Sequence, residues 1–334
     1  MQSLVIFAAL LIAFSAQAAP GQFVNLLGTQ GTAPIADEVN AGDPRIERLV
    51  GAPDDVWERI RRGFAMPDLA GRRVTSSEEW YAARPELVQS ILSRARRYLY
   101  YLVEEVERRG MPAEIALLPL VESGFNPKAV SDAQAAGLWQ FIPATGSRYG
   151  LAQDPHYDAR RDVVSSTAAA LDYLQFLHAT YRDWALALAA YNWGEQSLTR
   201  AIELSRARGQ DGSFATLSLP EETRNYVPRL QAVKNLVAEP GRFGIELGQL
   251  PNEPYFTVIR TQTPLSLAAA ASFAGISLDE LVLLNPGLST THIAGRQGIS
   301  LVLPVESAAE FRSNYARWLK SRPSARSTSR SVRQ

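Results

Sequence analysis

The chain has 334 residues, 46% of them hydrophobic, which is enough for one sizeable globular domain with smaller units attached. Lys and Arg together number 34, as do Asp and Glu, so the formal net charge is zero and gives no electrostatic case for nucleic-acid binding. The lack of cysteine excludes disulfides, thiol catalysis, thiolate metal sites and a lipid-modified Cys. Three widely separated histidines lack metal-ligand spacing, so we expect no metal or other cofactor.

The N-terminal segment has the pattern of a secretory signal. Residues 4–14 are almost wholly apolar and Ala16-Gln-Ala18 provides a small-x-small cleavage site, although no Lys or Arg precedes the apolar run. This run is shorter than the roughly 20 apolar residues that span a bilayer. We therefore expect a cleaved signal peptide over residues 1–19, export to a bacterial periplasm, and a mature chain without a transmembrane helix or a Cys-linked lipid. Peripheral attachment to a membrane stays open.

A leader rich in Gly, Ala, Pro, Thr and Asn follows over residues 20–50, and its composition predicts a flexible segment. Helical patterning starts near Asp54, where acidic residues suit the first turn of a helix. Apolar residues at helical spacing predict one long helix from Pro85 to Arg109, ended by Gly110.

Short helices are predicted for most of residues 113–238. Ala and Leu recur at helical spacing, Gly, Pro and Asn separate the runs, and no strand-like alternation is longer than about four residues. Pro119 should kink or delimit the helix that contains it. The fold class is therefore mainly α, with one domain over residues 51–240 that combines an N-terminal helical extension with a core over residues 110–238.

The C-terminal part changes in composition after Pro240 and predicts a small α+β unit over residues 250–306. Its elements follow one another as strand, helix, helix and strand, at residues 255–260, 265–273, 278–284 and 299–304. Residues 321–334 are rich in Ser and Arg, which predicts a disordered tail.

One carboxylate, Glu122, lies where an apolar run ends and a polar turn begins. Walls of Leu, Val, Phe and Trp would remove its hydration and disfavour its charged form, so it should hold a proton near neutral pH. A general acid that cleaves a glycosidic bond needs such a proton. Taken alone, Glu122 would more often be a surface glutamate at a helix end, but the neighbouring motifs reverse that preference.

Three motifs occur in order: Glu122-Ser123, Gly137-Leu-Trp-Gln140 and Ala190-Tyr-Asn192. Together they resemble the signature of the soluble-lytic-transglycosylase (SLT) family, which has a lysozyme-like fold of the goose type. Further blocks bring the resemblance to the membrane-bound lytic murein transglycosylase D group across residues 50–304. These blocks are residues 55–64, 116–123, 157–162 and 222–228.

The resemblance implies that Glu122 is the sole catalytic acid and base. It would first protonate the glycosidic oxygen between N-acetylmuramic acid (MurNAc) and N-acetylglucosamine (GlcNAc). As a carboxylate it would then take the proton from the MurNAc C6 hydroxyl, which attacks C1 and leaves a 1,6-anhydro ring. Peptidoglycan glycan strands would be the substrate, and one carboxylate would suffice where ordinary glycosidases use two.

The same resemblance implies a set of substrate-binding residues around Glu122. They are Ser123, Ser131, Gly137, Leu138, Trp139, Gln140, Tyr191, Asn192 and Tyr226. Several also have a structural interpretation. Ser131 suits a turn cap, Trp139 suits the core as well as a sugar platform, and Tyr226 suits a packed aromatic more often than a support for Glu122.

The C-terminal unit resembles a LysM module, a βααβ fold that binds GlcNAc-containing glycans. The resemblance rests on Leu278-Asp-Glu-Leu281, Leu284-Asn-Pro-Gly287 and Leu301-Val-Leu-Pro304. The unit is degenerate at Arg260-Thr-Gln-Thr-Pro264, where a Gly-Asp-Thr turn is usual. Glycan binding and a packing role are equally favoured interpretations.

Two other functions stay open from the sequence. A hydrolase on the same fold, a muramidase or chitinase, would need a second carboxylate facing Glu122. The acids nearest to the motifs are Asp132, Asp158, Asp162 and Glu195, of which Asp158 and Asp162 lie among arginines and should form ion pairs. The other alternative is a catalytically silent peptidoglycan-binding protein.

Overall fold

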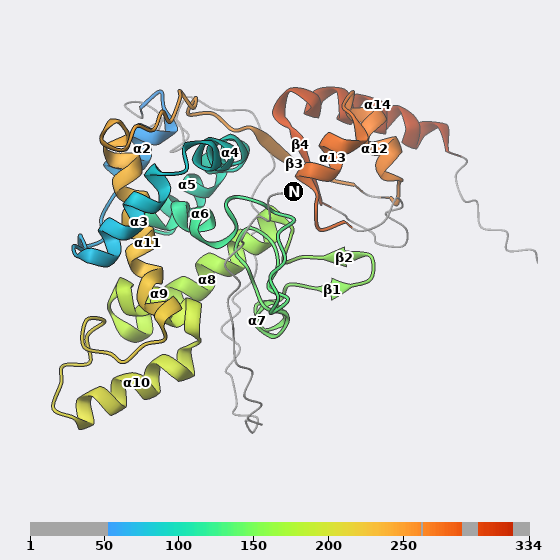
Figure 1. Cartoon of the computed structure of the whole chain (residues 1–334). Helices are drawn as coiled ribbons and strands as arrows, with labels where there is room; N and C mark the ends of the chain where they lie inside the picture. The colour runs from blue at the N-terminus through green and yellow to red at the C-terminus, as the bar shows by residue number, and fades with distance from the viewer. Residues whose placement is uncertain (1–52, 262, 289–299, 323–334) are drawn as a thin grey trace, which may run out of the picture.

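The structure is a computed structural model that describes residues 53–261, 263–288 and 300–322. A larger helical unit comes first in the chain and a smaller α+β unit follows it (Figure 1). The predicted signal peptide, the leader and all of the predicted tail beyond residue 322 lie outside the described residues.

Helices make up nearly all of the larger unit. They are α2 (Val56–Arg62), α3 (Arg72–Ala82), α4 (Pro85–Ala95), α5 (Leu99–Arg108), α6 (Leu118–Ser123), α7 (Pro143–Arg148), α8 (Val163–Tyr181), α9 (Trp184–Trp193), α10 (Glu195–Ala207) and α11 (Glu221–Ala238), with 3-10 turns η1 (Ala113–Leu117) and η2 (Pro240–Phe243). The mainly α fold class is confirmed.

Local chemistry sets several helix ends as the sequence predicts. α2 begins after Asp55, whose Oδ1 accepts hydrogen bonds from the backbone N–H groups of Trp57 at 2.8 Å and Glu58 at 3.2 Å. Pro119 lies in the first turn of α6, where its missing N–H removes no helical hydrogen bond, so it delimits the helix rather than breaking it.

The core of the larger unit surrounds the segment that leads to Glu122. Ile115, Leu117 and Leu118 are completely buried there. α11 packs against α3, α9 and α6 (Figure 1), because its buried face carries apolar side chains along most of its length. The ends of α6 and α9 and one face of α11 therefore converge, although they are far apart in the sequence.

The prediction of a single helix over residues 85–109 is wrong. α4 ends at Ala95 and α5 begins at Leu99, and a tight turn with a bond from Tyr98 N–H to the Ala95 carbonyl (2.9 Å) separates them. The side chain of Tyr98 is buried at this turn. The break coincides with burial of the Tyr98 ring in the core, which the spacing of apolar residues cannot predict.

A short hairpin leaves the helical unit beside α7. Its strands β1 (Gln153–Asp154) and β2 (Tyr157–Asp158) pair antiparallel and contain two residues each, too few to show alternation in the sequence. Figure 1 shows the hairpin projecting on the same side of the helical unit as the smaller unit.

The smaller unit has the predicted strand–helix–helix–strand order. It contains β3 (Phe256–Arg260), α12 (Leu267–Ala274), α13 (Leu278–Leu284), β4 (Ser300–Pro304), the 3-10 turn η3 (Val305–Ser307) and α14 (Ala308–Ser321). β3 pairs antiparallel with β4, with Phe256 opposite Pro304. The sequence reasoning missed α14, which packs on α12 and buries Phe311 and Tyr315.

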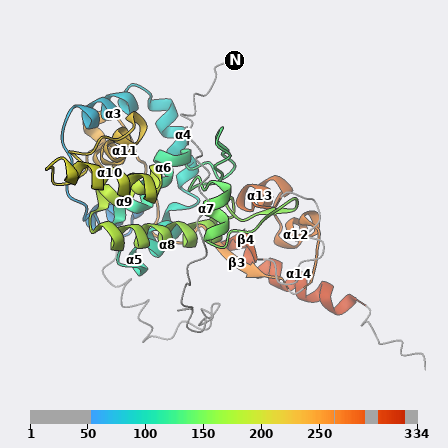
Figure 2. The same ribbon diagram turned by 90° about the horizontal axis from the view of Figure 1, so that it is seen from below.

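The two units contact each other through the hairpin. The backbone N–H of Asp158 donates to the Gly287 carbonyl at 2.8 Å, and Tyr157 forms a β-bridge with Leu288. Elsewhere the rings of Tyr101 and Phe256 lie 5.2 Å apart. Figure 2 shows the smaller unit lying to one side of the helical unit, with α13 and β4 facing α7.

Within the described ranges, no single helix is long and apolar enough to cross a membrane. α12 and α13 together have sufficient length and apolar character, but they are bent by 104°. α12 packs on α14, and α13 packs on β4.

Candidate active site

A cavity of about 1310 Å³ lies at the end of α6. Its lining comes from α3, α4 and α6, the segment of residues 129–142, the end of α9 and one face of α11. Of the residues predicted from the resemblance, those that line it are Glu122, Ser123, Ser131, Gln140, Tyr191, Asn192 and Tyr226.

Glu122 lies in the last turn of α6, which ends with Gly124 in the left-handed conformation (φ 56°). The phenol of Tyr226 donates a hydrogen bond to Glu122 Oε1. Burial raises the pKa of Glu122 to about 7, the Tyr226 hydrogen bond lowers it, nearby Glu222 raises it, and Arg229 lowers it. Burial therefore favours the protonated form of this carboxyl up to about pH 7.

Two neutral phenols flank this carboxyl. Burial, reinforced by the charge of Glu122, raises the pKa values of Tyr191 and Tyr226 well above the usual range. Tyr191 donates to the Trp139 carbonyl at 2.9 Å. Asn192 Oδ1 accepts from the Thr223 hydroxyl at 2.8 Å, which fixes the orientation of the amide and leaves its NH₂ group as the donor.

The segment of residues 129–142 is held by bonds within itself. Ser131 Oγ accepts from the Ala135 N–H at 3.1 Å, and Gln140 Nε2 donates to the Gly137 carbonyl at 2.7 Å. Gln134 and Gln140 have positive φ angles of 59° and 49°, which are strained for residues with a side chain. Such strain persists only where surrounding contacts impose it.

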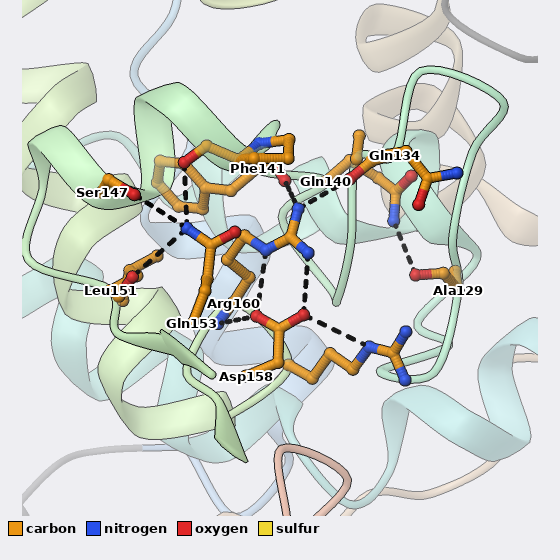
Figure 3. Close-up of polar contacts among 12 residues, drawn as sticks. Ala129, Gln134, Gln140, Phe141, Ser147, Leu151, Gln153, Asp158 and Arg160 are labelled. Atoms are coloured by element: carbon orange, nitrogen blue, oxygen red, sulfur yellow. Dashed lines mark hydrogen bonds and ion pairs between the residues drawn. The ribbon is translucent and has the colours of Figure 1, made fainter. Parts of the chain in front are cut away.

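Arg160 supplies those contacts, as Figure 3 shows. Its Nη1 donates to the carbonyls of Gln134 at 2.6 Å and Phe141 at 3.1 Å, while its Nε and Nη2 bind the Asp158 carboxylate at 2.9 and 2.8 Å. Gly137 touches the same residue, because a Cβ there would lie 1.9 Å from the Arg160 carbonyl oxygen. Arg160 was assigned no role from the sequence, although this residue lies within residues 157–162, one of the blocks that carry the family resemblance.

Three predicted substrate contacts need correction. Leu138 and Trp139 are 1% and 0% exposed and do not line the cavity, and Trp139 Nε1 donates to the Thr167 hydroxyl at 3.0 Å within the core. Gly137 also lies outside the lining and serves the close approach to Arg160. Ser123 lines the cavity, but its hydroxyl donates to the Leu138 carbonyl at 3.0 Å and so ties α6 to the opposite segment.

None of the rival acids predicted from the sequence lines the cavity. Asp158 forms the expected ion pair with Arg160, whereas Asp162 instead caps α8 by accepting from the Ser165 N–H at 2.7 Å. Glu195 pairs with Arg148 on the surface.

Two other acids, Glu221 and Glu222, do line the cavity. Glu221 binds Arg73 at 2.6 Å, and Glu222 acts on Glu122 through its charge. Glu222 belongs to the block of residues 222–228, which was the signal that could have identified it.

Chemically, the arrangement is a carboxyl with a raised pKa that lines an open cavity and accepts a hydrogen bond from a phenol. Such a group can donate its proton to an acetal oxygen and stabilise the resulting carboxylate through the phenol. Among the residues that the structure describes, no group of three or more His, Cys, Asp or Glu side chains is placed to hold a metal ion.

Comparison with known proteins identifies two families along the chain. Residues 100–214 match the family described as transglycosylase SLT domain, and residues 255–319 match the lytic transglycosylase MltD, LysM-like domain. The first match contains the three motifs around Glu122, and the second covers α14 up to residue 319. Both resemblances inferred from the motifs are thereby confirmed.

Curated relatives agree with these matches. The chain is 37% identical over 267 residues to membrane-bound lytic murein transglycosylase D of Escherichia coli (strain K12), which covers 79% of this chain and 59% of that protein. It is 30% identical over 176 residues to membrane-bound lytic murein transglycosylase C of Glaesserella parasuis serovar 5, which covers 45% of this chain and 48% of that protein. The chain thus spans 59% of the length of the first of these relatives and 48% of the length of the second. The chain thus carries a transglycosylase SLT domain in residues 100–214 and the LysM-like domain of lytic transglycosylase MltD in residues 255–319.

Proposed function

We propose that this chain is a peptidoglycan lytic transglycosylase that cleaves the β-1,4 bond between MurNAc and GlcNAc without water and leaves 1,6-anhydro-MurNAc ends. The observation that carries the proposal is the Glu122 carboxyl in the cavity, whose pKa burial raises to about 7 and whose Oε1 accepts a hydrogen bond from Tyr226. The SLT match and the relatives named lytic murein transglycosylase support the same activity.

The reaction needs one proton to leave Glu122 and one to return. Glu122 protonates the glycosidic oxygen as the bond to MurNAc C1 breaks, and the GlcNAc hydroxyl departs. The Glu122 carboxylate then accepts the proton of the MurNAc C6 hydroxyl as that oxygen bonds to C1. Tyr226 stabilises the intermediate carboxylate through its hydrogen bond, and the cycle ends with Glu122 protonated again.

The other cavity residues would hold the substrate. Tyr191, Asn192 and Gln140 present an aromatic ring and amide groups to the cavity, which suits N-acetyl sugars. Ser131 and Ser123 shape the wall through their own bonds. These roles complete the set that the family resemblance implies for the residues that line the cavity.

The domain plan and location extend this proposal. We infer that residues 51–240 form the catalytic domain and that residues 250–306, extended by α14, form the LysM-like unit. Residues 1–19 would direct export, so the enzyme would work in the periplasm on the cell wall. The chain contains no cysteine that could carry a lipid, so any attachment to the membrane through these residues would be peripheral.

The test is mass spectrometry of muropeptides released from purified cell-wall sacculi by the parent and by Glu122→Gln, with circular dichroism to verify that both fold. The proposal expects anhydro-MurNAc ends from the parent and none from the variant. Reducing ends from the parent would indicate a hydrolase. Binding without release by a folded parent would indicate a catalytically silent binding protein.

A further inference from the structure

The cavity that contains Glu122 is rich in arginine on the side formed by α3 and α4. The residues that line it there are Arg72 on α3, Arg94 on α4 and Arg84, which precedes α4, and all three come before the SLT match at residue 100. Arg73 lines the same side but is paired with Glu221, so its charge is compensated. The SLT match therefore does not account for the charge of this wall.

Arg94 is the most enclosed of these residues. Its Nε donates to the Gly124 carbonyl at 2.8 Å and its Nη1 donates to the Ser90 hydroxyl at 2.8 Å, both of them uncharged partners. Gly124 follows Glu122 by two residues, so the Arg94 guanidinium lies beside the C-terminal end of α6, which carries Glu122. Burial lowers the pKa of Arg94, and among the described residues no carboxylate offsets that effect.

Arg84 and Arg72 extend the same wall towards solvent. The Arg84 guanidinium lies 4.5 Å above the ring of Trp80, and its Nη1 donates to the Trp80 carbonyl at 2.9 Å. This stacking holds the cation in place beside an aromatic surface that also lines the cavity. Arg72, the first residue of α3, is exposed.

We propose that Arg72, Arg84 and Arg94, the arginine wall, bind the carboxylates carried by the MurNAc residues of the glycan strand. This inference rests on the proposed function. The sugar hydroxyls and acetamides of such a strand are neutral, whereas guanidinium groups pair best with carboxylates. Two sources offer that chemistry: the acidic groups of a peptide stem and the lactyl carboxylate that is exposed when the stem has been removed.

The test compares strands with stems, strands stripped by an amidase, and both kinds after conversion of their carboxylates to neutral amides. Anhydro products from the parent are measured as kcat and KM. The arginine wall predicts a lower KM for strands that keep carboxylates, and a preference for one of the two unmodified strands identifies the source. Raising the salt concentration should weaken this preference, because exposed charges are screened.

Arg84→Gln is the decisive variant because Arg84 is exposed and its substitution should leave the fold intact. We expect its KM to rise about two- to fivefold for strands that keep carboxylates, the range for a partly exposed ion pair, with kcat and the amidated strands unaffected. Arg94→Gln should raise KM further and Arg94→Lys should restore part of it. The matched control is Arg312→Gln, which replaces an exposed arginine on α14 and should change neither KM nor kcat.

Equal KM values for carboxylate and amidated strands in the parent, unaltered by Arg84→Gln, would overturn the arginine wall while leaving the proposed function intact. A parent that releases no anhydro product from any strand would overturn the proposed function instead.

Discussion

At the scale of single residues, the environment of Glu122 determines how activity depends on pH. Its pKa of about 7 means that the acid form needed for the first proton transfer disappears as the pH rises through that value. We expect the rate of anhydro-product release to fall about tenfold for each pH unit above the pKa. Rates measured from pH 5 to pH 9 on soluble glycan strands test this. A rate that keeps rising above pH 8 would contradict Glu122 as the acid.

Tyr226 should tune the same titration. Its hydrogen bond favours the carboxylate form of Glu122 and lowers the pKa, so Tyr226→Phe should raise that pKa and move the fall in activity to higher pH. The variant also leaves the carboxylate unsupported after proton transfer, so kcat should drop about tenfold or more. A pH profile identical to that of the parent would reduce Tyr226 to a packed aromatic.

Substitution of Glu222 should shift the pKa of Glu122 in the opposite direction, and it distinguishes a transglycosylase from a hydrolase. Its negative charge raises the pKa of Glu122, so Glu222→Gln should lower that pKa and move the fall in activity to lower pH. A transglycosylase needs no second carboxylate, so the variant should keep most of its rate at pH 5. If Glu222→Gln abolished activity at every pH and the parent released reducing ends, Glu222 would be the second carboxylate of a hydrolase.

The sequence alone could identify Glu122 because its chemistry is local. The apolar run and the polar turn adjoin it in the chain, the motifs follow it in a characteristic order, and the structure places Tyr191, Asn192 and Tyr226 around the same cavity. Trp139 was misassigned because nothing in the sequence distinguishes a buried indole from an exposed sugar platform. Glu222 was missed because its effect on Glu122 depends on how α11 crosses α6, which is a matter of packing.

At the scale of elements, the prediction succeeded where one residue determines the geometry and failed where distant packing does. Asp55 and Pro119 set helix ends by their own hydrogen-bonding chemistry. The break between α4 and α5 depends on which surface each segment buries, and apolar spacing continues through it and therefore cannot locate it. α14 differs, because Phe311, Tyr315 and Trp318 recur at helical spacing and could have predicted it.

Arg160 connects the hairpin to the wall of the cavity, so its loss should affect more than one element. Its guanidinium is buried, pairs with Asp158 and binds the carbonyls of Gln134 and Phe141. Arg160→Gln should reduce the free energy of unfolding by about 3 kcal/mol, the usual effect of leaving one partner of a buried pair alone. Activity should also fall, because the strained backbone around Gln140 loses its support.

Chemical denaturation and strand cleavage measure the two effects. Arg62→Gln is the control, since Arg62 is 59% exposed and pairs with Glu58 on the surface. Its free energy of unfolding should change by less than about 1 kcal/mol. An Arg160→Gln protein as stable as this control would show that the backbone of residues 134–141 holds its conformation without the guanidinium.

At the scale of the whole molecule, a continuous series of hydrogen bonds connects the smaller unit to the wall of the cavity. Gly287 binds the backbone of Asp158, the Asp158 side chain binds Arg160, and Arg160 binds the segment that carries Gln140. The LysM-like unit thus packs against the hairpin, and the hairpin supports the segment of residues 129–142 beside Glu122. Sequence patterns could not predict this contact, because it joins two segments more than a hundred residues apart.

Gly287→Ala tests whether that contact matters. A Cβ at this position would lie 2.9 Å from the Asp158 carbonyl oxygen and 3.2 Å from the Asp162 nitrogen, so the units must separate slightly. We expect faster backbone hydrogen exchange in residues 153–160 and a modest loss of activity on soluble strands. Gly241→Ala, where a Cβ meets no atom within 4 Å, is the matched control. Because neither glycine has a positive φ, neither substitution strains the backbone, and any difference between the two variants comes from the contact itself. Equal rates of backbone hydrogen exchange in the two variants would mean that the segment of residues 129–142 keeps its shape without close contact to the smaller unit.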